Sequence, residues 1–552
     1  MKLKNILYSM MMGTAVLTGT TSCVSDLDQY PHTETTSKDV YTSLANYEAV
    51  LGKIYAAMVT SGQGKGGDNK DMESVLNNGS GFDYMRMFIN MQECGTDEFA
   101  STWLTGEQTT GLTYLSWDAN DAWVSDMYYR IYYNIALCNE FLRNANSASF
   151  SGADAEKMKE YKAEVRFMRA LFYYHALDFY RNIPMVTEND PVGSFIPPRY
   201  TPQQTFDYIE SELKDCVGDM LPASTCPYGQ ASQGAAYTLL AKLYLNSEVY
   251  TGVAKYAECK EACKKVMDMG YSLESDYSKL FNADNDKRTN EIIFALPVSA
   301  EHTVSWGSST YLVCGQLSMS NANQNVADFG ATSGWSEFRL RPEFVDKFTQ
   351  TDIDGGGDKR CKFFTNGQSK DVTSMTDETT GYLSEKWSNL KDDGTTASNT
   401  ADAGVETDYP LFRLADVYLM YAECVARLGE DWDNWDGGSD AEAATRKEGA
   451  IYYINKVRER AYGDAEHNVW KDNFASDADF LQFILDERAR ELYHEGYRRT
   501  DLIRFGEFTT NKYIWQWKGG THDGQAVDSK YNIYPIPNTE LTANPNLHND
   551  NY

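Results

Sequence analysis

The stretch that decides the fold is residues 161–180, YKAEVRFMRALFYYHALDFY. Its apolar side chains recur at spacings of three and four, as Val165, Met168 and Phe172 illustrate. This is the period of one face of an α-helix. The sequence NIP at 182–184 ends the predicted helix, because a residue before proline disfavours the helical region. The stretch therefore predicts a long helix with an apolar face for its neighbours.

The same period recurs on both sides of this stretch. Alanines stand where neighbouring helices would approach closely, at Ala235, Ala236, Ala241, Ala415 and Ala422. Successive helices joined by short turns predict an all-α fold, a helical-hairpin array of tetratricopeptide type, although its repeat of about 34 residues is interrupted by insertions. The predicted helices cover residues 38–59, 118–145, 161–180, 202–216, 232–247, 254–269, 411–428, 441–460 and 477–493.

Two long segments, residues 61–117 and 298–409, show few helical patterns. They are rich in Gly, Ser, Thr, Asn and Asp, and they are too long to be simple connections inside a compact domain. We therefore expect them to carry the function. Six of the eleven tryptophans lie in these segments or at their edges: Trp103, Trp117, Trp123, Trp306, Trp335 and Trp387.

Residues 1–22 have the layout of a secretory signal peptide. Two lysines precede a mostly apolar run at 6–17, which is too short to span a bilayer. The sequence TTSC at 20–23 resembles a bacterial lipoprotein box, with threonine where such boxes usually have leucine. In that class the cysteine is acylated, so we expect Cys23 to carry a lipid anchor. The alternative is an ordinary signal followed by an unmodified cysteine.

Composition excludes some classes of function. The formal net charge of −30 argues against binding nucleic acid, because such binding depends on neutralising phosphates. After residue 17 no segment is apolar for about 18 residues, so lipid would be the only membrane attachment. The cysteines lack C-x-x-C spacing, which disfavours a zinc site. Cys216 and Cys226 are candidates for a disulfide in an exported protein, which the sequence leaves open.

Motifs of enzyme chemistry are missing from the sequence. It has no H-E-x-x-H, no G-x-S-x-G and no phosphate-binding G-x-x-x-x-G-K-[ST]. The run DERARE at 486–491 alternates in charge on a predicted helix, and we interpret it as a structural ion-pair network. A glycoside hydrolase stays open as an alternative, because 80 acidic residues supply many close carboxylate pairs by chance.

Seven segments match one known family nearly end to end, from residue 23 to residue 552. They are AEVRFMRALFYYHALDFY (163–180), GAAYTLLAKLYLNSEVYTG (234–252), NEIIFALP (290–297), PLFRLADVYLMYAE (410–423), INKVRERA (454–461), DERARELYHEGYRRTDLIRFGEF (486–508) and YPIPNTELTANPNL (534–547). The chain thereby resembles the SusD/RagB family of outer-membrane glycan-binding lipoproteins from Bacteroidetes. The segments SSTYLVCG (308–315) and FTTNKYIWQWKGG (508–520) are similar to starch-binding members.

The resemblance implies a single large domain over 23–552, with an N-terminal part at about 23–225 and a C-terminal part at about 226–552. Four tetratricopeptide-like helix pairs would form the scaffold, and irregular loops would form a glycan site. The protein would be lipid-anchored in the outer membrane and face the cell exterior. There it would capture starch or malto-oligosaccharides and pass them to a SusC-like TonB-dependent transporter, without cleaving them and without a required cofactor.

Two alternatives of other kinds stay open. In the first, the same module binds a different glycan. In the second, the helical array acts chiefly as a scaffold for the transporter, and sugar binding is incidental.

The resemblance also implies a glycan-binding site. Its residues would be Trp103, Trp306, Trp335, Arg86, Asn78, Glu107 and Gln108. A sugar ring has apolar C–H faces that pack on an indole, and three indoles in an arc would follow the curved outside of an α-1,4-glucan. Asn78 stands where starch-binding members have an acid, and Gly106 where they have asparagine, so the hydrogen-bonding part of the site has drifted.

The resemblance further implies a structural Ca²⁺ site at Asp284, Asp286, Glu406 and Asp408. Hard carboxylate oxygens are the ligands that Ca²⁺ prefers. A solvated acidic turn fits these residues equally.

Overall fold

The computed structural model describes residues 37–64, 71–76, 82–193, 195–399, 404–432 and 449–552. The chain divides into two units, Met1–Ala49 and Val50–Tyr552. The described part of the first unit consists of α2 (Ser37–Val40) and the start of α3 (Leu44–Ala56). The helix predicted at 38–59 is therefore two helices separated by a turn. The predicted signal peptide and Cys23 lie outside the described residues.

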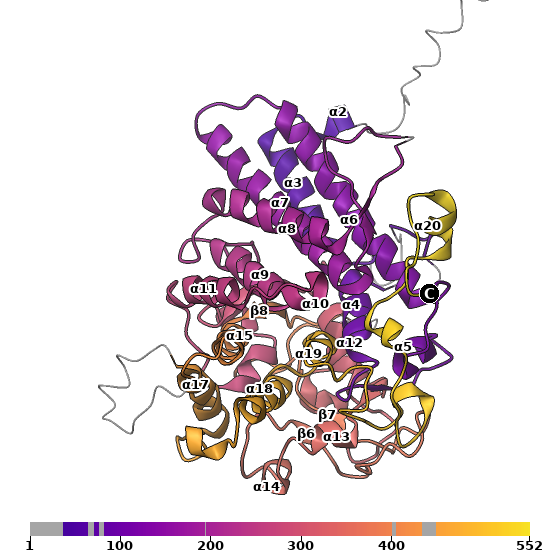
Figure 1. Ribbon diagram of the computed structural model, residues 1–552, viewed down its shortest axis with the longest axis vertical. Helices are drawn as coiled ribbons and strands as arrows, with labels where there is room; N and C mark the ends of the chain where they lie inside the picture. The colour runs from indigo at the N-terminus through magenta and orange to yellow at the C-terminus, as the bar shows by residue number, and fades with distance from the viewer. Residues whose placement is uncertain (1–36, 65–70, 77–81, 194, 400–403, 433–448) are drawn as a thin grey trace, which may run out of the picture. The chain divides into compact units, whose positions relative to one another are not determined.

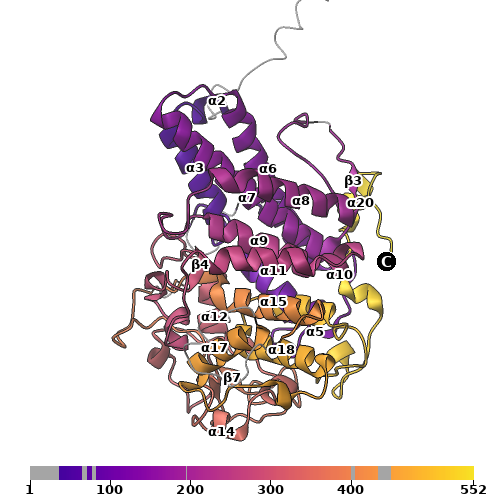
Figure 2. The same cartoon turned by 60° about the vertical axis from the view of Figure 1, so that its left-hand side comes forward.

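Helices pack in sequence order through the second unit (Figures 1 and 2). Successive pairs are α6 (Ala122–Ser147) with α7 (Ala153–Tyr180), α8 (Pro202–Cys216) with α9 (Gln233–Leu245), α11 (Tyr256–Met267) with α15 (Leu414–Arg427), and α17 (Ala450–Tyr462) with α18 (Asp477–Leu492). The all-α hairpin array predicted from the sequence is confirmed. None of the helices in the described part of the chain is long and apolar enough to cross a bilayer.

The stretch that predicted the fold forms most of α7. Val165, Met168 and Phe172 are fully buried, because α7 packs between α6 and α8. The helix ends at Arg181, whose φ is 62° and whose Nη1 donates to the carbonyl of Leu177 (2.6 Å). The next residues form β2 (Ile183–Pro184), which pairs with β3 (Arg199–Tyr200). The proline thus ends the helix where the sequence predicted.

Several short elements escaped prediction, among them one strand and two helices near the long loops. The segment predicted as helix from 411 begins as β8 (Tyr409–Arg413), which pairs antiparallel with β4 (Ile292–Leu296). Two helices, α4 (Tyr84–Glu93) and α12 (Ser308–Gly315), lie inside the predicted loops. Every residue of both helices is buried. In α4 the polar residues Arg86, Asn90 and Glu93 do recur at helical spacing, but both helices are shorter than the window of about 11–18 residues over which such a period is recognised.

Strand pairing holds the two long loop segments in place. The segment 297–408 leaves the array at the end of β4 and returns at β8, so its two ends are fixed side by side. Along the way β5 (Phe338–Arg339) pairs with β1 (Ala100–Ser101), which belongs to the other long segment. The excursion also contains α13 (Pro342–Val345), α14 (Gln350–Ile353), β6 (Phe363–Phe364) and β7 (Leu383–Ser384).

The charged run on α18 forms the predicted ion-pair network. Glu491 is fully buried and contacts the guanidinium groups of Arg360 (3.2 Å), Arg413 (2.5 Å) and Arg460. Burial by itself would raise the pKa of Glu491, but these three arginines lower it to about 2. The network connects α18 to β8, α17 and the loop at 358–360. The charged side chains can be buried because each is paired with an opposite charge.

The cysteines of the described residues form no disulfide. All nine cysteines in the described residues are free, including Cys216 and Cys226.

Candidate functional site

Arg86, in the first turn of α4, connects the loops that carry the predicted site residues. Its side chain is buried, and its Nη1 donates to the carbonyl of Trp306 at 2.8 Å. Its Nη2 donates to the carboxylates of Glu107 (2.5 Å) and Glu337 (2.8 Å). Residues from three separate loops therefore converge on one guanidinium group.

Aromatic rings surround the same guanidinium. The Arg86 Cζ lies 3.9 Å from the ring centroid of Phe82, 4.3 Å from that of Tyr311 and 5.8 Å from that of Trp335. A guanidinium at such distances is attracted by the negative face of a ring. Arg86 thus contacts the indole of Trp335 and the backbone of Trp306 at once.

The β1–β5 ladder brings Trp103 close to Trp335. Beyond the paired strands, the Thr102 N–H donates to the carbonyl of Glu337 and its hydroxyl to the carbonyl of Ser336, both at 2.7 Å. Trp103 and Trp335 each lie one residue past this contact. The backbone at Trp103 therefore runs next to the segment that carries Trp335.

Asp83 fixes the segment that carries Trp306. Its carboxylate caps α4 by accepting from the Arg86 N–H (2.8 Å), and it also accepts from the Ser308 N–H (3.1 Å) and the Ser305 hydroxyl (2.5 Å). Gly307 makes this approach possible, because a Cβ there would lie 2.1 Å from Asp83 Oδ1. Asp83 thus fixes the backbone of this segment, while the Trp306 side chain is 42% exposed.

Strained backbone accompanies the site. Gln108, Ser308 and Ser336 have φ angles of 58°, 48° and 48°, in the left-handed region that side chains with a Cβ rarely adopt. They are three of the seven non-glycine residues with positive φ in the described chain. Each lies within two residues of Glu107, Trp306 or Trp335. Such strain gathers at functional sites, where surrounding contacts compensate for its energetic cost.

The six loop tryptophans divide into two groups. Trp117, Trp123 and Trp387 are buried and belong to the core. Trp306 is exposed, and Trp103 and Trp335 are half-buried. The Trp335 Nε1 donates to the Ser333 hydroxyl (3.1 Å), which orients its ring. The tryptophans that retain exposed ring surface are the three that the sequence singled out.

The other predicted residues are placed as follows. Glu107 binds Arg86, and its carbonyl accepts from the buried Trp123 Nε1 (2.7 Å). Gln108 is exposed beside it, and Asn78 lies outside the described residues. Arg86 sits beneath the tryptophans with both terminal nitrogens already bonded. Its role as a donor to sugar hydroxyls stays a prediction, and its observed contacts are those of a support.

Two carboxylates share the Arg86 guanidinium, and the pKa of one of them, Glu337, is shifted. Burial, with the nearby Glu107 charge, raises the pKa of Glu337 to about 8 even though Arg86 opposes the shift. Burial would lower the pKa of Arg86, but Glu337 and Glu107 raise it well above its ordinary range. The guanidinium therefore stays charged, and Glu337 is the group that titrates near neutral pH.

Sequence reasoning missed Glu337, Asp83 and Tyr311 as parts of the site. The Tyr311 hydroxyl donates to Asn90 (2.6 Å) and Glu337 (3.0 Å), so it extends the support around Arg86. Asp83 alone left a local signal, because an aspartate three residues before Arg86 is a typical helix cap. Nothing in the sequence distinguishes Glu337 from the other acidic residues.

The four predicted calcium ligands are engaged with protein donors where their contacts are described. Asp408 accepts from the Val298 N–H (2.7 Å) and the Tyr228 hydroxyl (2.7 Å), and Asp284 pairs with Lys287 (2.8 Å). Burial, with Asp286 and Glu406 nearby, raises the pKa of Asp408 to about 6. Within the described residues no three His, Cys, Asp or Glu are grouped as metal ligands. The side chains as arranged do not fit Ca²⁺, and the calcium site stays a prediction.

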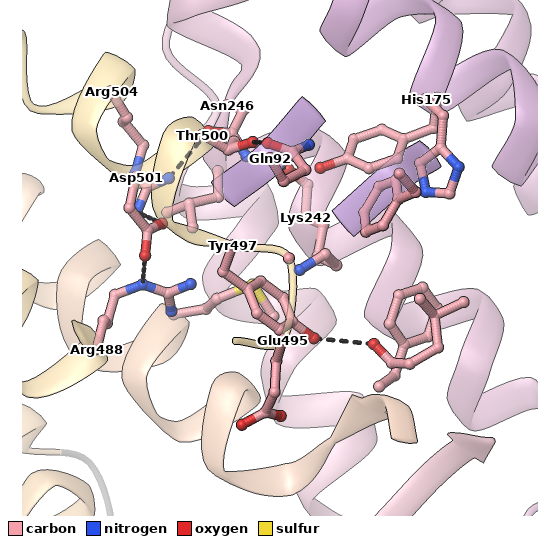
Figure 3. Close-up of a pocket in the computed structure, with 17 residues that line it drawn as sticks. Gln92, His175, Lys242, Asn246, Arg488, Glu495, Tyr497, Thr500, Asp501 and Arg504 are labelled. Atoms are coloured by element: carbon pink, nitrogen blue, oxygen red, sulfur yellow. Dashed lines mark hydrogen bonds and ion pairs between the residues drawn. The ribbon is translucent and has the colours of Figure 1, made fainter. Parts of the chain in front are cut away.

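An enclosed cavity in the interior is too small for a sugar. It lies among α4, α7, α9, β8 and α18–α19 (Arg498–Arg504) and is lined by charged groups such as Lys242, Arg488 and Asp501 (Figure 3). The Arg488 Nε donates to Asp501 (2.7 Å), so these charges bind each other. The volume of ≈ 30 Å³ is that of about one water molecule. This cavity is part of the buried ion-pair core, not a ligand site.

Comparison with known proteins shows which family the chain resembles in sequence. A family profile described as "SusD family" matches residues 362–552, and one described as "Starch-binding associating with outer membrane" matches residues 27–245. The chain is 32% identical to the starch-binding protein SusD of Bacteroides thetaiotaomicron. The gapped alignment has 594 positions and covers 99% of each chain.

Solved structures show the same fold at lower identity. A SusD superfamily protein from Parabacteroides distasonis superimposes with a TM-score of 0.67 at 22% identity, over 94% of this chain and 100% of that one. Surface glycan-binding protein A from Bacteroides thetaiotaomicron, in complex with laminarihexaose, gives a TM-score of 0.65 at 16% identity, over 92% and 99%.

Proposed function

The chain belongs to the SusD/RagB family of carbohydrate-binding, outer-membrane-associated proteins, and from this premise we propose that it captures α-glucans such as starch at the cell surface. The observation that carries the proposal is that Arg86 contacts the backbone of Trp306 and the indole of Trp335, while Trp103, Trp306 and Trp335 all stay partly accessible. The starch-binding relative, similar over its whole length, supports the choice of glycan.

The chemistry of the site suits reversible capture. Each indole supplies a flat apolar surface for the C–H face of a glucose ring, and such contacts contribute about 0.5–1.5 kcal/mol each beyond burial. Glu107 and Gln108 add hydrogen-bonding groups at the edge. The sum corresponds to roughly micromolar to millimolar dissociation constants, which allow the sugar to move onward.

The cellular setting forms part of the same proposal. Cys23 carries a lipid that anchors the protein in the outer membrane, facing the exterior, and bound oligosaccharide passes to a SusC-like TonB-dependent transporter. The protein binds the glycan and does not cleave it, which agrees with the carbohydrate-binding character of its family. Release of reducing ends from maltoheptaose by the pure protein would contradict this part.

A second candidate is the same module tuned to a different glycan. Gly106 and Asn78 differ from the residues of starch-binding members, and a structural neighbour is known with laminarihexaose. The similarity to a starch-binding relative over 99% of the chain favours the α-glucan as first choice.

Affinity electrophoresis tests the proposal. The wild type is expected to be retarded in gels that contain amylopectin, and Trp103→Ala with Trp335→Ala is expected to abolish most of the retardation. Parallel gels with β-linked glucans distinguish the second candidate. An unretarded wild type, or equal retardation of the double variant, would reject the α-glucan assignment.

A further inference from the structure

A second cleft lies on the helical array and shares no residue with the candidate site. It is bounded by the end of α11 and the following residues 268–275, by Tyr418 on α15, and by one face of α17. These three helices pack on one another in order and lie at the left of Figure 1. The cleft is open and has a volume of ≈ 850 Å³. Ligand sites in proteins typically have about 300–1,000 Å³.

Four tyrosines line this cleft, together with charged side chains. Tyr418 and Tyr453 lie with ring centroids 4.8 Å apart, and Tyr452 meets Tyr453 edge to face at 5.0 Å. Tyr271 lines the cleft from the segment after α11. Tyr271, Tyr418 and Tyr452 are half-buried, so part of each ring faces the cleft. Such rings provide amphipathic contact surface with little side-chain entropy to lose.

Hydrogen-bonding groups of the cleft are available while its charges are largely balanced. Within the described chain the hydroxyls of Tyr418 and Tyr452 have no hydrogen-bond partner. Lys456 pairs with Glu459 at 2.8 Å. Elsewhere in the lining, Lys264 pairs with Glu261 (3.5 Å) and Arg460 with Glu291 (3.3 Å). Lys359 and Asp268 add one charge of each sign. A ligand here meets aromatic surface and free donors without a strong net charge, which favours a neutral polyhydroxylated molecule over an anion.

We propose that this cleft is a second carbohydrate subsite that holds a neutral oligosaccharide segment. The inference rests on the proposed function, because the ligand is a further stretch of the glycan that the indoles capture. Two sites on one protein raise the affinity for a long polymer well beyond that for a short chain, since the second contact becomes intramolecular. The second subsite therefore helps to retain polymers at the cell surface.

Hydrogen exchange of the full-length protein with and without maltoheptaose tests the proposal locally. Slower exchange is expected at two places, the cleft segment 268–275 and the site loops around 103–108 and 305–308. Tyr452→Ala is expected to remove the slowing at 268–275 and to keep it at the loops, whereas Tyr452→Phe, which retains the ring, keeps both. Tyr237→Ala, a half-buried tyrosine on α9 outside the cleft, is the matched control.

The outcomes separate the two assignments. Slowing at the loops alone would overturn the second subsite and leave the proposed function intact. Slowing at 268–275 alone would support the subsite and reject the indole site, and slowing at neither place would overturn both. In amylopectin gels, Tyr452→Ala is further expected to weaken binding about 2- to 10-fold while Tyr237→Ala leaves it unchanged. Equal mobility of these two variants would contradict the subsite.

Discussion

The Arg86 guanidinium donates a 2.8 Å hydrogen bond to the main-chain carbonyl of Trp306, 220 positions further along the chain. The same side chain binds Glu337, which follows Trp335 by two residues, and Glu107, which follows Trp103 by four. One buried cation thus binds the loops that carry Trp103, Trp306 and Trp335. Changes in this support should reach glycan binding even where they touch no sugar.

The charge state of Glu337 should make stability depend on pH. Its folded pKa of about 8 lies above the ordinary 4.5, so its contribution to stability is complete below about pH 4.5 and is lost as pH rises through 8. We expect the wild type to lose stability relative to Glu337→Gln over that range, by at most about 1.4 kcal/mol per pH unit. Urea unfolding at several pH values measures this. The exposed Glu301→Gln is the control, and parallel curves for wild type and Glu337→Gln would refute the shift.

Substitution of Gly307 should disturb the contact between Asp83 and the segment that carries Trp306. An alanine Cβ would lie 2.1 Å from Asp83 Oδ1, so either the cap of α4 or the Trp306 segment must move. We expect Gly307→Ala to weaken amylopectin binding at least about 5-fold and to cost about 1 kcal/mol of stability through the disturbed cap. Gly218→Ala, whose Cβ would meet nothing within 4 Å, should do neither. Unchanged binding by Gly307→Ala would show that the support does not position Trp306.

Position 106 offers a gain of function. Gly106 is exposed, and a Cβ there would meet nothing within 4 Å, so a side chain fits without strain. Asparagine at this position would restore the hydrogen-bonding group that starch-binding members are expected to have. We predict that Gly106→Asn tightens maltoheptaose binding about 2- to 10-fold in calorimetry, the value of one net hydrogen bond. Gly106→Ala should leave the affinity unchanged, and an equal effect of both variants would argue against a contact with sugar.

Calcium binding, which the family resemblance implies, can be tested through Asp408. Because the pKa of Asp408 is raised to about 6, its carboxylate is ionised at pH 8 and largely protonated at pH 5. If the loops rearrange to bind Ca²⁺, millimolar CaCl₂ should raise Tm at about pH 8, less at about pH 5, and not in Asp408→Asn. Equal Tm values in CaCl₂ and in chelator at both pH values would favour the acidic-turn interpretation.

The long helices were predictable from sequence, and two short ones were not. In α7 the spacing of Val165, Met168 and Phe172 reports the packed face directly. α4 and α12 are both shorter than the window of about 11–18 residues over which a helical period is recognised, and α12 has its polar residues only at its start. The start of β8 was assigned to a helix because its pairing with β4, about 115 positions away, depends on tertiary contacts.

The site residues stay a prediction from family resemblance, and the support that the structure shows beneath them was not predicted. Resemblance selected Trp103, Trp306 and Trp335, whereas composition alone could not separate them from the buried Trp117 and Trp387.

The contact between Arg86 and Glu337 joins residues 251 positions apart. It exists only because β1 pairs with β5, and no local pattern records that pairing. Arg86, which the resemblance predicts to bond sugar hydroxyls, is therefore buried and contacts the loops that carry Trp306 and Trp335.

Trp306 gives the most direct test of the central claim, because its side chain is 42% exposed and its loss should not disturb the fold. We predict that Trp306→Ala weakens maltoheptaose binding about 2- to 10-fold in titration calorimetry while Tm stays within about 1 °C of the wild type. Trp470→Ala removes an indole of similar exposure (37%) outside the site and should leave the affinity unchanged. Equal affinities for wild type and Trp306→Ala would contradict the account.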